Sequence, residues 1–288
     1  MFCENVFTTV PPDAEIHIYN IMFNPRKVLN LLIIITSVVL LSGGCSKDDN
    51  SYNNTSFTLI KKDVFGISGT VTFTETSNNS TIIDVTLNGA PSGTHPVNLY
   101  NSTTIEDSIV YKSLNSIDGS GKSSTIVDIP YGKLISYDGC IKILKSDSEP
   151  TVILAQGDIG GNVITSTYKT YNLITIPAYG VTGTAKFEKR ANGTTLVTIA
   201  LVDFIVGPAD YFATINLGSI ETVDELTIRK TLNNINGTTG KSYTNIKFLD
   251  SKIPITYDKW LVYLGYINIY QTAILPANVI SHGNIGSN

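Results

Sequence analysis

The feature that most constrains the fold of this chain is an internal repeat. Residues 66–73 (GISGTVTF) align without gaps with residues 180–187 (GVTGTAKF), and the same offset of 114 carries residues 81–87 onto 195–201. Two further matched blocks are 114–123 with 232–242 and 139–162 with 265–288. The offset grows along the chain from 114 to 126, as loop insertions would make it grow, and residues 232–242 contain one residue more than residues 114–123. Because the repeated unit is much longer than a solenoid repeat, the sequence predicts two domains of the same kind.

Each copy has the residue pattern of β-strands. Apolar residues alternate with Thr and Asp, as at Ile83, Val85 and Leu87. A period of two is typical of a strand with one buried and one solvent-exposed face. Turn-forming Asn-Gly, Asp-Gly and Pro-Ser-Gly clusters separate these runs. The nearest approach to a helical period is at residues 221–232. We therefore expect an all-β chain with two tandem antiparallel β-sandwich or barrel domains.

The first 62 residues have a different character. Arg26 and Lys27 precede an apolar run, 28–41, that is too short to span a bilayer and has the layout of a secretory signal. Small residues then lead to Cys45. The alternative interpretation is a short core helix, but a polar tract follows the run in place of a capped turn.

We expect the domain boundaries to be as follows: 1–21, an extension before the true start at Met22; 22–44, a signal peptide; 45–62, a modified cysteine and flexible tether; 63–162, the first domain; 163–179, a linker; and 180–288, the second domain.

The segment Ser42-Gly43-Gly44-Cys45 resembles the lipobox of bacterial lipoproteins, in which the cysteine is acylated. It departs from that pattern because Leu41 lies four places before Cys45, where the family has Leu at three. The residues that follow, Ser46-Lys47-Asp48-Asp49, resemble the acidic export signal of Bacteroidetes surface lipoproteins, although a merely solvated linker would read similarly. The resemblance implies a lipid anchor at Cys45 in the outer membrane, facing outward or, as the alternative, the periplasm.

The repeated domains resemble a known family in the order of their motifs. These are Gly-x-x-Gly-Thr at the first strand, His95-Pro96, a Leu-Asn-x-Ile-[Asp/Asn]-Gly turn, residues 137–143 (YDGCIKI) and the closing residues 155–162 (AQGDIGGN). Together they look like the chordin-type repeat, or CHRD module. The resemblance implies an extracellular β-sandwich or barrel, comparable with superoxide-dismutase-like or Ig-like folds, and assigns no activity. The second copy departs from it at residues 207–210 and 263–265.

Several kinds of chemistry find little support in the sequence. A net charge of −4, with 15% charged residues, argues against nucleic-acid binding. The segment 119–123 (GSGKS) lacks the first glycine of a phosphate loop, so no nucleotide is expected. His95 is only a weak candidate metal ligand, because such sites need three or more convergent ligands. Cys140 has Tyr266 as its counterpart, which favours a structural residue, and we expect neither cofactor nor catalysis.

Polar and glycine residues of the turns recur in both copies, and we expect them to be structural. They are Gly119, Gly121, Gly157, Asp158, Gly160 and Asn162 in the first copy and Gly237, Gly240, Gly283, Asn284, Gly286 and Asn288 in the second. The function we expect is therefore that of a lipid-anchored cell-envelope protein whose non-catalytic modules bind a protein or glycan. The alternative is an enzyme, either a degenerate copper/zinc-dismutase-like metalloprotein or a hydrolase with a loop-built site.

Overall fold

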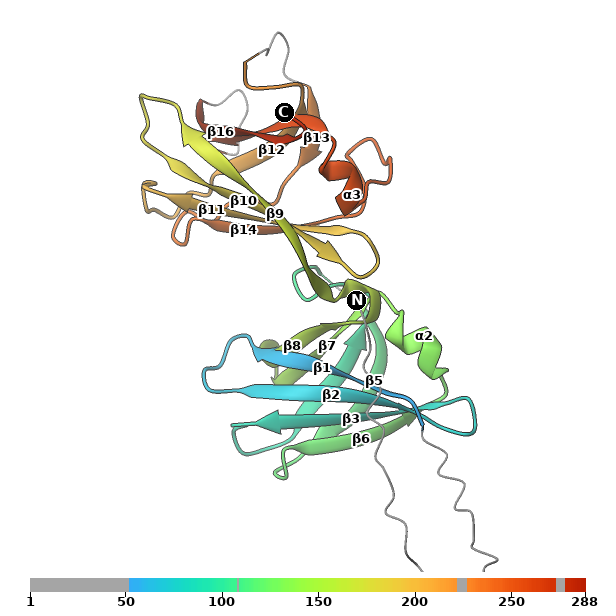
Figure 1. The fold of residues 1–288 in the computed structure, drawn as a ribbon. Coiled ribbons are helices and arrows are strands. Elements are labelled where there is room, and N and C mark those ends of the chain that lie inside the picture. Colours follow the sequence, from blue (N-terminus) through green and yellow to red (C-terminus); the bar gives the residue numbers. More distant parts are fainter. Residues whose placement is uncertain (1–51, 108, 222–226, 273–277) are drawn as a thin grey trace, which may run out of the picture. The chain divides into compact units, whose positions relative to one another are not determined.

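The computed structural model describes residues 52–107, 109–221, 227–272 and 278–288. These residues form two tandem antiparallel β domains, as the sequence predicts; each is an eight-stranded sheet that curls around its own core (Figure 1). We call the two units the first and the second barrel. The expected signal peptide, the expected lipidation site at Cys45 and the expected extension before Met22 lie outside the described residues.

The first barrel contains strands β1 to β8, in the spatial order β5-β4-β7-β8-β1-β2-β3-β6. Their bounds are β1 Asn54–Lys61, β2 Ser68–Glu75, β3 Thr81–Asn88, β4 His95–Tyr100, β5 Val110–Ile117, β6 Lys122–Val127, β7 Gly139–Ser146 and β8 Glu149–Ile159. A short helix, α2 (Tyr131–Ile135), precedes β7, and a single 3₁₀ turn, η1 (Gly160–Asn162), follows β8.

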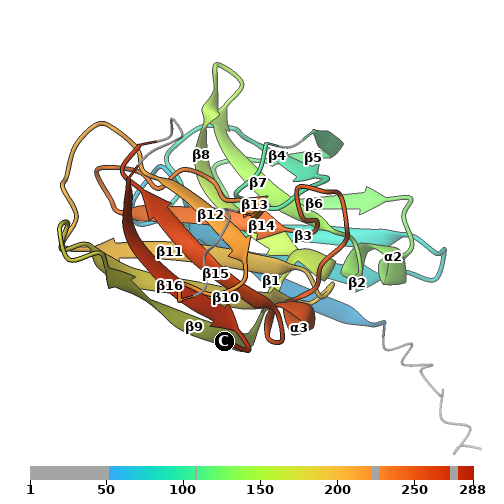
Figure 2. The same cartoon turned by 90° about the horizontal axis from the view of Figure 1, so that it is seen from above.

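The second barrel repeats this topology element by element, in the order β13-β12-β15-β16-β9-β10-β11-β14. Its strands are β9 Ile164–Thr175, β10 Thr182–Arg190, β11 Thr195–Val202, β12 Phe212–Leu217, β13 Ile228–Thr231, β14 Lys241–Ile246, β15 Leu264–Tyr270 and β16 Val279–Gly286. Helix α3 (Tyr257–Trp260) stands where α2 stands in the first barrel. Figure 2 shows β15, β16 and β9 side by side along one wall.

Two of the expected boundaries differ from the structure. Strand β1 lies within residues 45–62, which we expected to form a tether, and β9 lies within the expected linker, 163–179. Each is the central strand that pairs with its neighbours on both sides, β1 with β2 and β8 and β9 with β10 and β16. The sequence did not indicate either strand, because most of their residues are polar and face outward, while only a few apolar side chains point inward.

The inward faces build the two cores. Ile83, Val85 and Leu87 are all buried, and so are their counterparts in β11. The edge strands are tied across the barrel wall by the asparagine of the Leu-Asn motif. Asn115 donates from Nδ2 to the carbonyl oxygen of Ser124 at 2.7 Å, and Asn233 donates to that of Tyr243 at 2.7 Å. The predicted turn motif is thus also a clasp that holds the curled sheet together.

Candidate functional site

The closing Gly-[Asp/Asn]-Ile-Gly-x-Asn segment has a backbone role in each barrel. Gly160 and Gly286 adopt positive φ angles of 54° and 74°. A Cβ atom on either residue would overlap the backbone of Tyr137 or Tyr263. Gly157 and Gly283 have no room either, because a Cβ atom there would overlap the carbonyl oxygen of a residue in the neighbouring central strand. Only glycine fits these four positions without movement of the backbone.

The polar residues of this segment make equivalent hydrogen bonds in the two barrels. Asn162 Nδ2 donates to the Gly139 carbonyl oxygen at 3.3 Å, as Asn288 Nδ2 does to Gly265 at 2.7 Å. Asp158 and its counterpart Asn284 each hold a loop. Asp158 Oδ1 accepts from the backbone N–H of Thr104 at 2.7 Å, and Asn284 Oδ1 accepts from that of Ile220 at 3.0 Å. These repeated contacts organise the end of the barrel.

The glycines that follow β5 in the first barrel and β13 in the second form turns. Gly121 and Gly240 have positive φ angles of 72° and 65°, and their carbonyl oxygens accept hydrogen bonds from the backbone N–H of Leu87 and Leu201, both at 2.8 Å. A Cβ atom on Gly237 would overlap the Ala209 carbonyl oxygen, whereas Gly119 has open space around it. The residues of the phosphate-loop-like segment thus lie in a strand-to-strand turn with no helix after it.

The residues that could carry chemistry are dispersed and engaged elsewhere. His95 is buried, and its Nδ1 and Nε2 face the carbonyl oxygens of Lys145 and Pro91 at 2.7 and 3.0 Å. Burial raises the pKa of the Cys140 thiol to about 12, and burial lowers the pKa of His282. Among the described residues, no three His, Cys, Asp or Glu side chains come together as a metal site would require.

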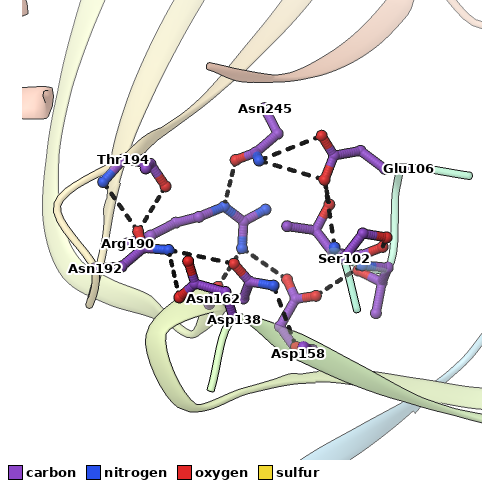
Figure 3. Close-up of polar contacts among 12 residues, drawn as sticks. Ser102, Glu106, Asp138, Asp158, Asn162, Arg190, Asn192, Thr194 and Asn245 are labelled. Carbon is purple, nitrogen blue, oxygen red and sulfur yellow. Dashed lines mark hydrogen bonds and ion pairs between the residues drawn. The ribbon is translucent and has the colours of Figure 1, made fainter. Parts of the chain in front are cut away.

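A polar cluster that sequence analysis did not identify lies between the two barrels (Figure 3). Its centre is Arg190, at the end of β10, whose side chain is fully buried. Nη1 donates to Asp158 Oδ2 at 2.7 Å and to the Asn162 carbonyl oxygen, and Nε donates to Asn245 Oδ1 at 2.9 Å. In the sequence, this cluster shows only as a difference between the two copies. The counterpart of Asp158 is Asn284, and that of Arg190 is Thr76.

This cluster connects the two barrels, and its carboxylates already have hydrogen-bond partners. Asn192 Nδ2 donates to Asp138 Oδ1 at 2.9 Å, and Asn245 Nδ2 approaches the Glu106 carboxylate at 3.4 and 3.5 Å. Glu106 also accepts from Thr103 Oγ1 at 2.7 Å. Both carboxyl oxygens of Asp158 are already hydrogen-bonded, so the group is a neutralised structural anchor.

The second barrel also carries an apolar hollow of about 260 Å³. It is lined by Tyr179, Val181, Ile205, Gly207, Pro208, Ala209, Tyr211, Gln271, Thr272 and Ile280. Ile205, at the edge of the hollow, and the adjacent Val206 are 78% and 66% exposed. An apolar depression next to exposed aliphatic side chains is typical of a binding surface.

The loop that presents Ile205 and Val206 is held in place by its own contacts. Tyr211 Oη donates to the Ile205 carbonyl oxygen at 2.6 Å, and the Gly207 N–H donates to the Gly237 carbonyl oxygen at 3.0 Å. The Phe204 ring meets the Tyr211 ring edge to face, with centroids 6.2 Å apart. The two aliphatic side chains therefore remain in water although the backbone around them is fixed.

The equivalent loop of the first barrel is different. It has Ala90, Pro91 and Ser92, and the hollow beside it, of about 510 Å³, is lined mainly by glycines and small or polar residues. The loop with exposed Ile205 and Val206 thus has no apolar equivalent at residues 90–92 of the first barrel.

Comparison with known proteins adds no relative: no protein-family model, curated protein or solved structure matched the chain. Within the described part of the chain, no helix is long and apolar enough to cross a membrane.

Proposed function

We propose that this chain is a lipid-anchored cell-envelope protein, held in the outer membrane through Cys45 and displayed outward, whose two CHRD-like barrels act as non-catalytic binding modules. The observation that carries the binding role is the apolar hollow of the second barrel, with its fixed loop that exposes Ile205 and Val206. The anchor rests on the sequence, where a short apolar run follows Arg26 and Lys27 and ends just before Cys45.

The rival function is that of an enzyme, a dismutase-like metalloprotein or a hydrolase. The contacts of His95 weigh against its use as a metal ligand, because both ring nitrogens face backbone carbonyl oxygens. Elemental analysis of the purified protein tests the metalloprotein. Stoichiometric copper or zinc would favour it over the binding role.

Replacing the anchor cysteine tests the proposed location. We expect Cys45→Ala to move the protein from the membrane fraction to the soluble fraction and to abolish incorporation of labelled fatty acid, because the proposed lipid is attached through the Cys45 sulfur. Ser46→Ala is the matched control, which leaves the thiol in place and should remain in the membrane fraction.

Retention of Cys45→Ala in the membrane fraction would contradict the anchor. Protease treatment of intact cells then distinguishes the two orientations. Digestion of the wild-type protein without lysis supports outward display, and protection until lysis would show that it faces the periplasm.

A further inference from the structure

We propose that the apolar hollow of the second barrel binds one bulky side chain of a basic peptide segment, that is, an aromatic or large aliphatic residue flanked by Lys or Arg. This inference rests on the proposed role of the barrels as binding modules and names the class of partner. Three observations carry it: the size of the hollow, the exposed aliphatic residues at its rim and the charge of the segments that line it.

The size of the hollow favours a side chain over a free small molecule. Its volume of about 260 Å³ lies below the roughly 300–1,000 Å³ that is usual for small-molecule sites. A cavity of this size suits a single anchoring side chain, which is how protein interfaces concentrate their binding energy. Tyr179 and Tyr211 supply aromatic walls, and Val181 and Ile280 supply aliphatic ones.

The rim extends the apolar surface beyond the hollow itself. Ile205 and Val206 are exposed on a loop that Tyr211 and Gly237 hold in position. Because the loop is already ordered, a partner that covers these residues gains the burial of apolar area without a large cost of ordering the loop. A peptide backbone lying across the rim would cover both residues.

The charge of the surrounding segments selects among partners. Residues 176–181 (IPAYGV) carry no charge, and residues 203–211 (DFIVGPADY) carry two carboxylates, Asp203 and Asp210, and no basic residue. Asp203 is exposed, and Asp210 accepts a hydrogen bond from the Gly237 N–H at 3.2 Å. A surface of this sign attracts a basic peptide and disfavours anionic lipid headgroups, which need Lys or Arg.

Methyl NMR of the full-length protein tests the inference with three short capped peptides. The probe is acetyl-Lys-Phe-Lys-amide, and the controls are acetyl-Glu-Phe-Glu-amide and acetyl-Lys-Ser-Lys-amide. We expect the first to shift the methyl resonances of Ile205 and Ile280, with a Kd of about 1 mM for so small a ligand. The acidic peptide should bind about three- to tenfold more weakly, and the serine peptide should cause no saturable shift.

Variants of exposed residues show whether the binding occurs at this place. Ile205→Ser with Val206→Ser should weaken binding at least about tenfold. The matched control Ile126→Ser, at a residue that is 71% exposed in the first barrel, should not change it. Asp203→Asn keeps a residue that tolerates the positive φ angle of this position, and Asp210→Asn keeps the oxygen that accepts from Gly237. Together they should abolish the tighter binding of the basic peptide relative to the acidic one. Asp84→Asn, an exposed carboxylate of the first barrel, is their control.

Each outcome has one meaning. Selective binding of the basic peptide at Ile205 and Ile280 supports the inference. Equal binding of the basic and acidic peptides would overturn the partner class and leave the binding role of the barrel standing. Absence of any shift with all three peptides would overturn the side-chain site, and the location of the protein would still be decided by the Cys45→Ala experiment.

Discussion

At the scale of single residues, the repeated glycines and asparagines show how a short motif specifies a barrel end. Gly160 is needed because its φ angle is positive and its α-carbon faces the backbone of Tyr137. Gly119 belongs to another repeated turn but has a negative φ and open space around it. Both glycines belong to repeated turn motifs, but only the Gly160 position excludes a side chain.

This contrast gives a stability prediction. We expect Gly160→Ala to lower the free energy of unfolding by at least about 1–3 kcal/mol, because the added Cβ meets the backbone in a conformation that L-residues rarely adopt. Gly119→Ala should change it by less than about 0.5 kcal/mol. Urea unfolding followed by far-UV circular dichroism measures both. Equal effects of the two substitutions would show that the close approach at Gly160 is unimportant.

At the scale of elements, the sequence predicts the strands that carry a clear alternation. The inward residues of β3 and β11 were identified correctly, and so was the all-β class. Strands β1 and β9 were missed. In β1 only Leu59 is fully buried, and five of its eight residues are Asn, Thr, Ser or Lys, so composition resembled a tether. Pairing on both sides, which a sequence pattern does not record, makes it central.

The strand assignment of β1 can be tested at adjacent residues. We expect Leu59→Ala to cost about 2–5 kcal/mol of stability, because Leu59 is fully buried in the first core. Ile60→Ala should cost much less, since Ile60 is 62% exposed on the outer face. A flexible tether would make both substitutions neutral, so a negligible effect of Leu59→Ala in thermal unfolding would contradict the strand.

At the scale of the whole molecule, the repeat accounts for two barrels but not for what joins them. Arg190 and Asp158 come from different copies, and neither has a charged counterpart in the other copy. Repeat analysis emphasises positions that agree between copies, whereas this junction depends on positions that differ. The apolar hollow was missed for the same reason, since Ile205 and Val206 occur only in the second copy.

The junction leads to the last prediction. We expect Arg190→Leu to destabilise the protein by about 3–5 kcal/mol, because it leaves the mostly buried Asp158 carboxylate without its cation. The adjacent substitution Lys189→Leu removes an exposed pair with Asp258 and should cost at most about 1 kcal/mol. Unfolding is followed by the fluorescence of Trp260, which reports on the second barrel, and by circular dichroism, which reports on both.

A double variant separates the loss of the pair from the loss of packing. If the cost of Arg190→Leu arises from an unpaired carboxylate, adding Asp158→Leu should recover a large part of it, because no buried charge then remains. In the single variant we also expect the fluorescence and dichroism transitions to move apart, since the barrels lose their shared ion pair. Coincident transitions with a cost no larger than that of Lys189→Leu would show that the barrels are held together by other contacts.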